Sequence, residues 1–158
     1  MAVTIEHGDL LQQEVDAIVN TVNTVGVMGK GIALQFKQRW PENFKAYAKA
    51  CTRGEVRPGH MFIHDAGGML KPRYIINFPT KRHWRERSRI EDIEAGLDDL
   101  IVQVRKLGIR SIAVPALGCG NGGLDWGLVR PRIERAFAKV SDIEVRLFAP
   151  EGAPGSPS

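Results

Sequence analysis

The sequence has few cysteines, no long apolar run and no visible internal repeat. Its two cysteines, Cys51 and Cys119, lie far apart and lack the spacing of metal ligands, which is typical of a protein with reduced thiols. The apolar runs are much shorter than a membrane span, and the N-terminus lacks the hydrophobic region of a signal peptide. We therefore expect a cytoplasmic protein with no membrane contact, no metal and no cofactor.

The length and composition predict one globular domain with its own hydrophobic core. The chain has 158 residues, of which 25% are charged and 43% hydrophobic. We expect the domain to span residues 1–149 and the Gly/Pro/Ser-rich tail, residues 150–158, to be disordered. The net charge of +4 weakly favours polyanionic partners.

The most informative stretch runs from Ser111 to Trp126, SIAVPALGCGNGGLDW. The apolar residues from Ile112 to Leu117 predict a short buried strand, four glycines follow, and a helical pattern resumes after Asp125. A strand, a glycine-rich turn and a helix in this order present backbone N–H groups to a phosphate. The composition of the turn is also compatible with a tight connection that binds nothing.

The rest of the chain alternates between strand and helix patterns. Further strands are predicted at residues 3–6, 16–20, 61–66, 74–78 and 143–148, and helices at residues 32–36, from Pro41 onward, and at residues 90–107 and 129–140. Ser88 and Glu91 have the spacing of a capping box, and Gly108 ends the helix that they introduce.

Strands that alternate with helices predict an α/β fold whose mostly parallel or mixed sheet is covered on both faces. In such a sheet ligands bind at the carboxyl ends of the strands. The segments after Asn20, Phe78 and Leu117 all leave strand ends, so we expect them to meet at one cleft.

Two familiar nucleotide motifs do not fit this chain. Gly118, Gly120 and Gly123 match the spacing of the dinucleotide fingerprint, but too few residues follow for a second mononucleotide-binding half. The other glycine-rich stretch, Gly26–Gly31, lacks the Gly-Lys-Ser/Thr ending of a P-loop. Two glycine-rich loops that hold a diphosphate from opposite sides fit the sequence better.

Four separated motifs resemble those of the macro domain, the ADP-ribose-binding α/β module. They are GDL at residues 8–10, VDAIVNTVN at 15–23, MGKGIA at 28–33 and PALGCG at 115–120. Within this superfamily the chain is most similar to the branch of the terminal ADP-ribose glycohydrolases and the DarG antitoxins, and NFPTKRHW at residues 77–84 points to the DarG type. The resemblance covers Val3 to Phe148 and implies a three-layer α/β/α fold with a mixed, mostly parallel central sheet.

The resemblance also implies an ADP-ribose site. Asp9 is expected to accept a hydrogen bond from the adenine amino group, Asn23 to contact the distal ribose, and Asn20 to hold its loop in place. Phe148 is a weaker candidate for the adenine wall, since a core role suits it better. The residues implied for ADP-ribose binding are Asp9, Leu10, Asn23, Met28, Gly29, Gly31, Ile32, Leu117, Gly118, Cys119, Gly120, Asn121, Gly122, Gly123 and Leu124.

Lys81 is the candidate catalytic residue, because the catalytic branch of the family has a lysine at this strand end. Its amine is expected either to form a Schiff base at C1″ of the distal ribose or to stay charged and stabilise the leaving base. Related protein-directed enzymes pair this lysine with an aspartate, but Gly122 stands at that place here, and Asp125 is not its equivalent. Lys81 is therefore expected to work with Asn23 or with the substrate's own phosphates.

The residues that follow Lys81 predict a surface for nucleic acid. Arg82, His83, Trp84 and Arg85 combine cations for phosphates with an indole on which a base can stack. Taken alone, such a run more often marks a solvated helix entry. Cys119 has no histidine in a nearby motif, which favours a small packed residue over a nucleophile.

These features lead to one main hypothesis and two alternatives. The main hypothesis is an ADP-ribosyl glycohydrolase that removes ADP-ribose from thymidine bases of single-stranded DNA, releases free ADP-ribose and counteracts a DarT-like toxin. The alternatives are a non-catalytic ADP-ribose reader and a glycohydrolase that acts on ADP-ribosylated protein carboxylates.

Overall fold

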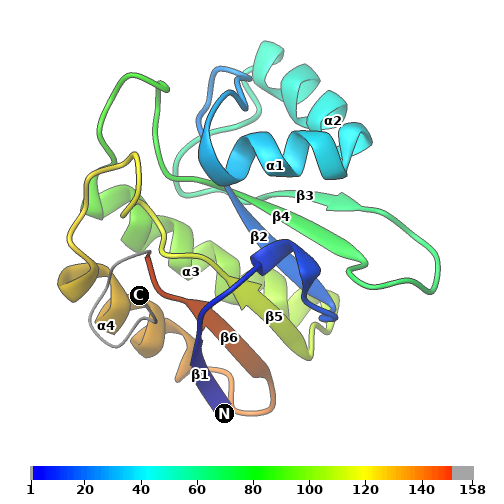
Figure 1. Ribbon diagram of the computed structural model, residues 1–158, viewed down its shortest axis with the longest axis vertical. Helices are drawn as coiled ribbons and strands as arrows, with labels where there is room; N and C mark the ends of the chain where they lie inside the picture. Colours follow the sequence, from blue (N-terminus) through cyan, green and yellow to red (C-terminus); the bar gives the residue numbers. More distant parts are fainter. Residues whose placement is uncertain (1, 151–158) are drawn as a thin grey trace.

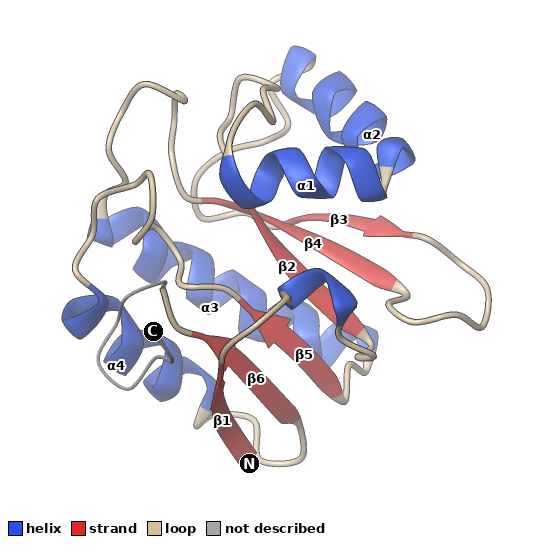
Figure 2. Ribbon diagram, viewed as in Figure 1, coloured by secondary structure: helices blue, strands red, loops and turns tan. Residues whose placement is uncertain are grey.

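The computed structural model describes residues 2–150, which form a six-stranded sheet between two layers of helices (Figures 1 and 2). The expected α/β class and the three-layer α/β/α arrangement are confirmed. The strands are β1 (Ala2–Glu6), β2 (Ala17–Val22), β3 (Phe62–Asp65), β4 (Tyr74–Pro79), β5 (Ser111–Val114) and β6 (Glu144–Phe148). The helices are η1 (Leu10–Gln12, a 3-10 turn), α1 (Gly31–Arg39), α2 (Pro41–Thr52), α3 (Ile90–Leu107) and α4 (Trp126–Phe137).

The sheet is mixed and mostly parallel, as predicted. Its strand order is β1-β6-β5-β2-β4-β3, and only β3 runs antiparallel to its neighbour, β4. The carboxyl ends of β2, β4 and β5 therefore lie at one edge of the sheet. This edge carries the loops that build the site.

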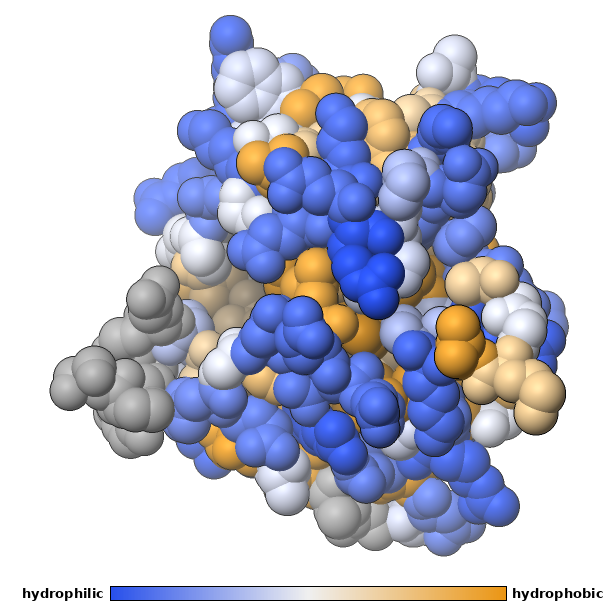
Figure 3. All heavy atoms as spheres, turned by 45° about the vertical axis from the view of Figure 1, so that its right-hand side comes forward, coloured by the Kyte–Doolittle hydropathy of each residue, from blue (hydrophilic) through white to orange (hydrophobic). Residues whose placement is uncertain are grey.

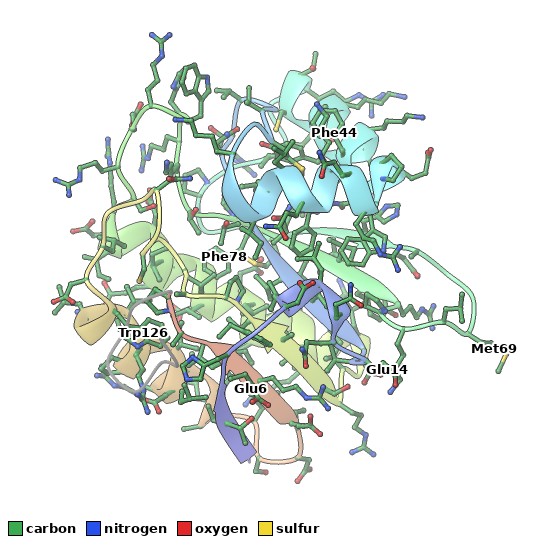
Figure 4. The ribbon with its side chains drawn as sticks, in the orientation of Figure 1. Glu6, Glu14, Phe44, Met69, Phe78 and Trp126 are labelled. Atoms are coloured by element: carbon green, nitrogen blue, oxygen red, sulfur yellow. The ribbon has the colours of Figure 1, made fainter. Side chains whose placement is uncertain are left out.

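Alternation along the strands gives each face of the sheet its own core. On β4, Ile76 and Phe78 pack toward α3 and α4, whereas Ile75 packs with Ile18 and Phe36 on the face of α1. The Phe78 side chain lies in the interior of the molecule (Figure 4), where its ring meets α3 at Gly96. An added Cβ at Gly96 would overlap that ring, so the glycine permits the close approach of helix and sheet.

Several boundaries differ from those expected. Strand β2 continues to Val22 because Thr21 and Val22 still pair with β4, whereas β5 ends at Val114, before Pro115. Helix α4 spans Trp126–Phe137 rather than residues 129–140, since the Asp125 carboxylate caps it by accepting from the Gly127 N–H.

The predicted capping box at Ser88 is wrong. Helix α3 begins at Ile90, so Arg89 occupies the N-cap position. The Arg89 side chain makes no capping hydrogen bond. Ser88 is instead buried, and its N–H donates to the Gly122 carbonyl at 3.0 Å. The residue therefore supports the second glycine loop rather than the helix.

The connection between β3 and β4 extends away from the body of the molecule (Figure 1). Met69 points into solvent at its tip, as Figure 4 shows, and Leu70 is also exposed; Figure 3 shows apolar side chains at this edge. None of the helices within residues 2–150 has the length and apolarity that crossing a membrane requires. Most of the expected tail lies outside the described residues, so both its disorder and the domain boundary stay predictions.

Candidate active site

A cleft of about 960 Å³ lies at the carboxyl edge of the sheet. The segments after β1, β2, β4, β5 and β6 all contribute to its walls, and α1 begins at it. The predicted convergence of the loops after Asn20, Phe78 and Leu117 is therefore confirmed. Its volume is at the upper end of the range for small-molecule sites, which suits an extended ligand.

The first glycine loop leads into an uncapped helix N-terminus. Lys30 is the residue before α1 and offers no side-chain cap. Within the described residues, the N–H groups of Gly31, Ile32 and Ala33 have no hydrogen-bond acceptor, and these three residues line the cleft. Free N–H groups at a helix N-terminus bind anions well, so this end of α1 is suited to a phosphate.

The second glycine loop faces α1 across the cleft. The loop is closed by hydrogen bonds from Leu124 N–H to the Gly118 carbonyl and from Gly123 N–H to the Gly120 carbonyl. In the part of the chain that the structure describes, the N–H groups of Gly120, Asn121 and Gly122 make no such bond. The Asn121 side chain lies close to Gly31: a Cβ added at Gly31 would be 3.4 Å from the Asn121 Nδ2. The two loops thus offer N–H donors to one diphosphate-sized space.

Asp9 lines the cleft and follows β1. One carboxylate oxygen, Oδ1, accepts from the Leu11 N–H at 2.9 Å and caps η1. Both the turn role and the ligand role expected for Asp9 are compatible with this geometry, because Oδ2 has no partner among residues 2–150. Phe148 lines the same cleft and also packs in the core beside Ile18, so its position is compatible with both the cleft role and the core role expected for it.

Asn23 and Asn20 hold the loop after β2. The Asn23 Oδ1 accepts from the N–H groups of Val25 and Val27 and from the Tyr47 hydroxyl, and its Nδ2 donates to the Val27 carbonyl at 2.8 Å. Asn20 is fully buried and its amide contacts Met28 and Asn77. The Asn23 side chain lines the cleft, but most of its hydrogen-bonding capacity already serves the loop.

Lys81 reaches the cleft from the end of β4. Its N–H and that of Thr80 donate to the Val22 carbonyl, so the residue is tied to the end of β2. The amine Nζ lies 3.4 Å from the Trp84 carbonyl. Partial burial, and then the positive charge of Lys30, lower the pKa of the Lys81 amine. A larger fraction of neutral amine is therefore present near neutral pH than for an exposed lysine.

The residues after Lys81 divide into a fixed part and an exposed part. Arg82 forms a two-pronged ion pair with Asp92 on the first turn of α3, both contacts at 3.3 Å, and its carbonyl accepts from Thr24. His83 stacks on Trp84, and the Arg85 guanidinium lies 4.5 Å from the centre of the Trp84 ring. Arg82 is thus engaged within the protein, whereas Trp84, 40% exposed, remains accessible.

The structure brings together most, but not all, of the predicted site residues. Asp9, Leu10, Asn23, Gly29, Gly31, Ile32, Lys81 and Trp84 line the cleft, as do Gly118, Gly120, Asn121 and Gly122. Met28 and Leu117 are buried in the core, and Cys119, Gly123 and Leu124 do not line the cleft. All five were expected in the ADP-ribose site, because position in the two motifs does not separate residues that face the cleft from those that anchor the turns.

Other cleft residues were missed by sequence reasoning. Lys30, Val27, Thr80 and His7 line the cleft, and the positive charge of Lys30 also lowers the pKa of Lys81.

Burial raises the pKa of the Cys119 thiol to about 11, and the Asp125 charge adds to this, so Cys119 is no activated nucleophile. Among residues 2–150 no cluster of His, Cys, Asp and Glu side chains has the arrangement of a metal site.

The fold and site define an α/β module with two glycine-rich turns at the carboxyl edge of its sheet, whose free N–H groups suit the phosphates of a nucleotide. The model of the family described as "Macro domain" matches residues 19–133. The chain belongs to the macro domain family.

Relatives and solved structures agree with this membership. The chain is 54% identical over 144 residues, 91% of its length, to a protein named DNA ADP-ribosyl glycohydrolase from Thermus aquaticus. The macrodomain of Mycobacterium tuberculosis DarG superposes with a TM-score of 0.93 at 56% identity, covering 94% of this chain and 98% of that one. Thermosipho africanus DarTG in complex with ADP-ribose gives a TM-score of 0.89 at 35% identity, covering 95% of this chain and 42% of that one.

The chain spans less than half the length of the DNA ADP-ribosyl glycohydrolases that it matches. It covers 40% of the Thermus aquaticus protein and 43% of the Mycobacterium tuberculosis protein.

Proposed function

We propose that this chain is a DNA ADP-ribosyl glycohydrolase that removes ADP-ribose from thymidine bases of single-stranded DNA. The observation that carries the proposal is the partly buried Lys81 amine, whose pKa is lowered, in the cleft that the two glycine loops line. The identity of 54–56% to proteins named for this activity supports it. We also propose that the enzyme acts in the cytoplasm.

The substrate is proposed to lie along the cleft from Asp9 to Lys81. The free Asp9 oxygen accepts from the adenine amino group, and Leu10 and Phe148 contact the ring. The N–H groups of α1 and of residues 120–122 hold the diphosphate. The Asn23 amide hydrogen that the loop leaves free then donates to the distal ribose, whose C1″ faces Lys81.

Of the two lysine mechanisms we propose the covalent one, with which the lowered pKa of Lys81 is consistent. The neutral Nζ attacks C1″, the C1″–N bond to thymine breaks, and thymine leaves with the bonding electrons and takes up the proton released from Nζ. The resulting glycosylamine opens to a Schiff base. Water hydrolyses it, which returns the free amine and ADP-ribose.

A DarT-type toxin is the partner proposed for this activity. A relative from Thermosipho africanus, 35% identical over 159 residues, is named a fusion of a DNA ADP-ribosyl transferase with a DNA ADP-ribosyl glycohydrolase. Transfer to DNA and removal from DNA in one polypeptide support an antitoxin role, in which this chain reverses the toxin's modification.

The test is release of ADP-ribose from a thymidine-modified oligonucleotide, followed by chromatography. We expect wild type to release it and Lys81→Ala to lose release by a factor of at least about 10³ while still binding free ADP-ribose. Borohydride during turnover should trap ADP-ribose on wild type and not on the variant; no trapping would favour a charged Lys81.

Ester-linked ADP-ribosyl protein is the second substrate in this experiment. Release from the ester alone would support the protein-directed alternative. Binding of ADP-ribose without release from either substrate would make the chain a reader and would contradict the proposal.

A further inference from the structure

The positive charge of this chain is concentrated in two stretches. Residues 30–57 contain seven basic and two acidic side chains, and residues 81–85 contain three basic and no acidic ones. The remaining residues carry twelve basic and sixteen acidic side chains, so the entire positive excess comes from these two stretches. A polyanion is therefore attracted to the surface they share.

The two stretches lie on neighbouring elements of the structure. Thr24 joins the loop after β2 to residues 81–85, since its N–H and hydroxyl both donate to the Arg82 carbonyl. The same loop rests on α2: a Cβ added at Gly26 would lie 3.6 Å from the Cys51 Cβ and 3.7 Å from the Ala48 Cα. Figure 1 shows the loops and α2 together beyond the ends of β2 and β4.

Helix α2 presents a stripe of cations beside this loop. Lys45, Lys49 and Arg53 follow one another at intervals of four residues, which places them along one side of the helix and its C-cap. All three are exposed. Lys45 pairs with Glu42, but within residues 2–150 neither Lys49 nor Arg53 forms an ion pair, so their charges are available to phosphates.

Apolar side chains lie between Lys81 and this stripe. Val25 is 46% exposed and Val27 39% exposed, and both belong to the loop that bridges Lys81 and α2. Together with Trp84 they offer surfaces for unstacked bases, whereas Lys49 and Arg53 offer charges for the backbone. Proteins bind single-stranded nucleic acid by combining a positively charged groove with aromatic faces on which bases stack, and here Trp84 supplies the aromatic face.

We infer that Lys49 and Arg53 hold the DNA strand that leaves the site, after it crosses Val25, Val27 and Trp84. This inference rests on the proposed function, because the modified thymidine places the strand at Lys81. It adds a second contact outside the ADP-ribose cleft. Recognition of the substrate then depends on the length of the strand as well as on the ADP-ribosyl group.

The test compares a modified thymidine in a 20-nucleotide strand with the same base in a trinucleotide. Reversing both charges in Lys49→Glu/Arg53→Glu should raise KM for the long substrate about ten-fold at low salt and leave the trinucleotide unchanged. For the long strand, the slope of log KM against log salt concentration should decrease by about 1.4, because two phosphate contacts are lost and each contributes ~0.7 to the slope. The matched control, Lys106→Glu/Lys139→Glu, makes the same charge change near the end of α3 and after α4.

Binding of an unmodified 20-nucleotide strand, measured by fluorescence anisotropy, separates the possible failures. If wild type releases ADP-ribose but both double variants behave alike on the long strand, the path along α2 is wrong and the proposed function stands. If wild type cleaves neither substrate, the proposed function fails. The α2 surface is then judged by binding alone, where equal affinities of the two variants overturn it.

Discussion

At the scale of single residues, the site depends on how neighbours tune Lys81. The amine is partly buried, and Lys30 at the start of α1 places a second positive charge nearby. Both effects disfavour the charged form and lower its pKa. Lys30 therefore serves two roles in the proposed enzyme, because it also lines the cleft that receives the diphosphate.

Replacing Lys30 tests this electrostatic effect. In Lys30→Gln the repulsion is lost, so the pKa of Lys81 should move upward toward its ordinary value. If the neutral amine is the nucleophile, kcat rises as pH increases through that pKa, and the variant shifts this rise to higher pH. The measurement is the pH dependence of kcat, with Lys106→Gln as the control.

The direction of the pH profile separates the two lysine mechanisms. A charged Lys81 that stabilises the leaving base would give a kcat that falls as pH increases through its pKa. An unshifted profile in Lys30→Gln would contradict the coupling between the two lysines.

At the scale of elements, the position of α3 depends on its close packing against the sheet. Gly96 faces the Phe78 ring, and Asp92 on the first turn binds Arg82, the residue next to Lys81. Helix α3 therefore supports the loop that carries Lys81 as well as the core. Ser88, just before the helix, adds a contact to the second glycine loop.

Substitution of Gly96 by alanine measures this packing. The added methyl overlaps the Phe78 ring, and we expect a loss of ~1–3 kcal/mol in the free energy of unfolding, because such overpacking outweighs the better helix propensity of alanine. Urea unfolding provides the measurement.

Two further variants make the result specific to that contact. A Cβ at Gly127 in α4 would lie 3.6 Å from the Asp125 carboxylate, an ordinary contact, so Gly127→Ala should not destabilise the protein. Phe78→Leu in the Gly96→Ala background should recover part of the lost stability. Equal stability of Gly96→Ala and wild type would refute the close approach.

At the scale of the whole molecule, the cleft joins both helical layers through the carboxyl edge of the sheet. Its walls come from segments after β1, β2, β4, β5 and β6. A ligand that bridges these segments stabilises the folded state and has no site in the unfolded chain. Thermal stability therefore reports binding even where no reaction occurs.

ADP-ribose should raise the unfolding temperature, and above Kd the increase should follow the logarithm of the ADP-ribose concentration. At a hundred times Kd the expected stabilisation is ~2.7 kcal/mol, or roughly 5–10 °C for a domain of this size. Differential scanning fluorimetry should show the shift in wild type and in Lys81→Ala, and a smaller one in Asp9→Ala. A shift of the same size in Asp9→Ala would exclude Asp9 from the proposed adenine contact.

The sequence by itself determined the class of fold and the place of the cleft. Asp9, Lys81 and the glycines at residues 118–122 each follow a strand, and in a mostly parallel sheet such positions meet at one edge whatever the details of packing. The strands and helices could be predicted from the local periodicity of apolar residues alone. The boundaries at Val22 and Val114 were missed, because strand pairing and a proline decided them.

Only the tertiary structure decided what the polar residues of the site do. Arg82 faces Asp92, all but one amide hydrogen of the Asn23 side chain is engaged by its own loop and Tyr47, and Ser88 supports Gly122 instead of capping α3. Each of these contacts joins groups whose partners are set by the approach of separate elements. Residue type and spacing along the chain carry no information about such partners, since a side chain binds whichever group the folded chain brings within reach.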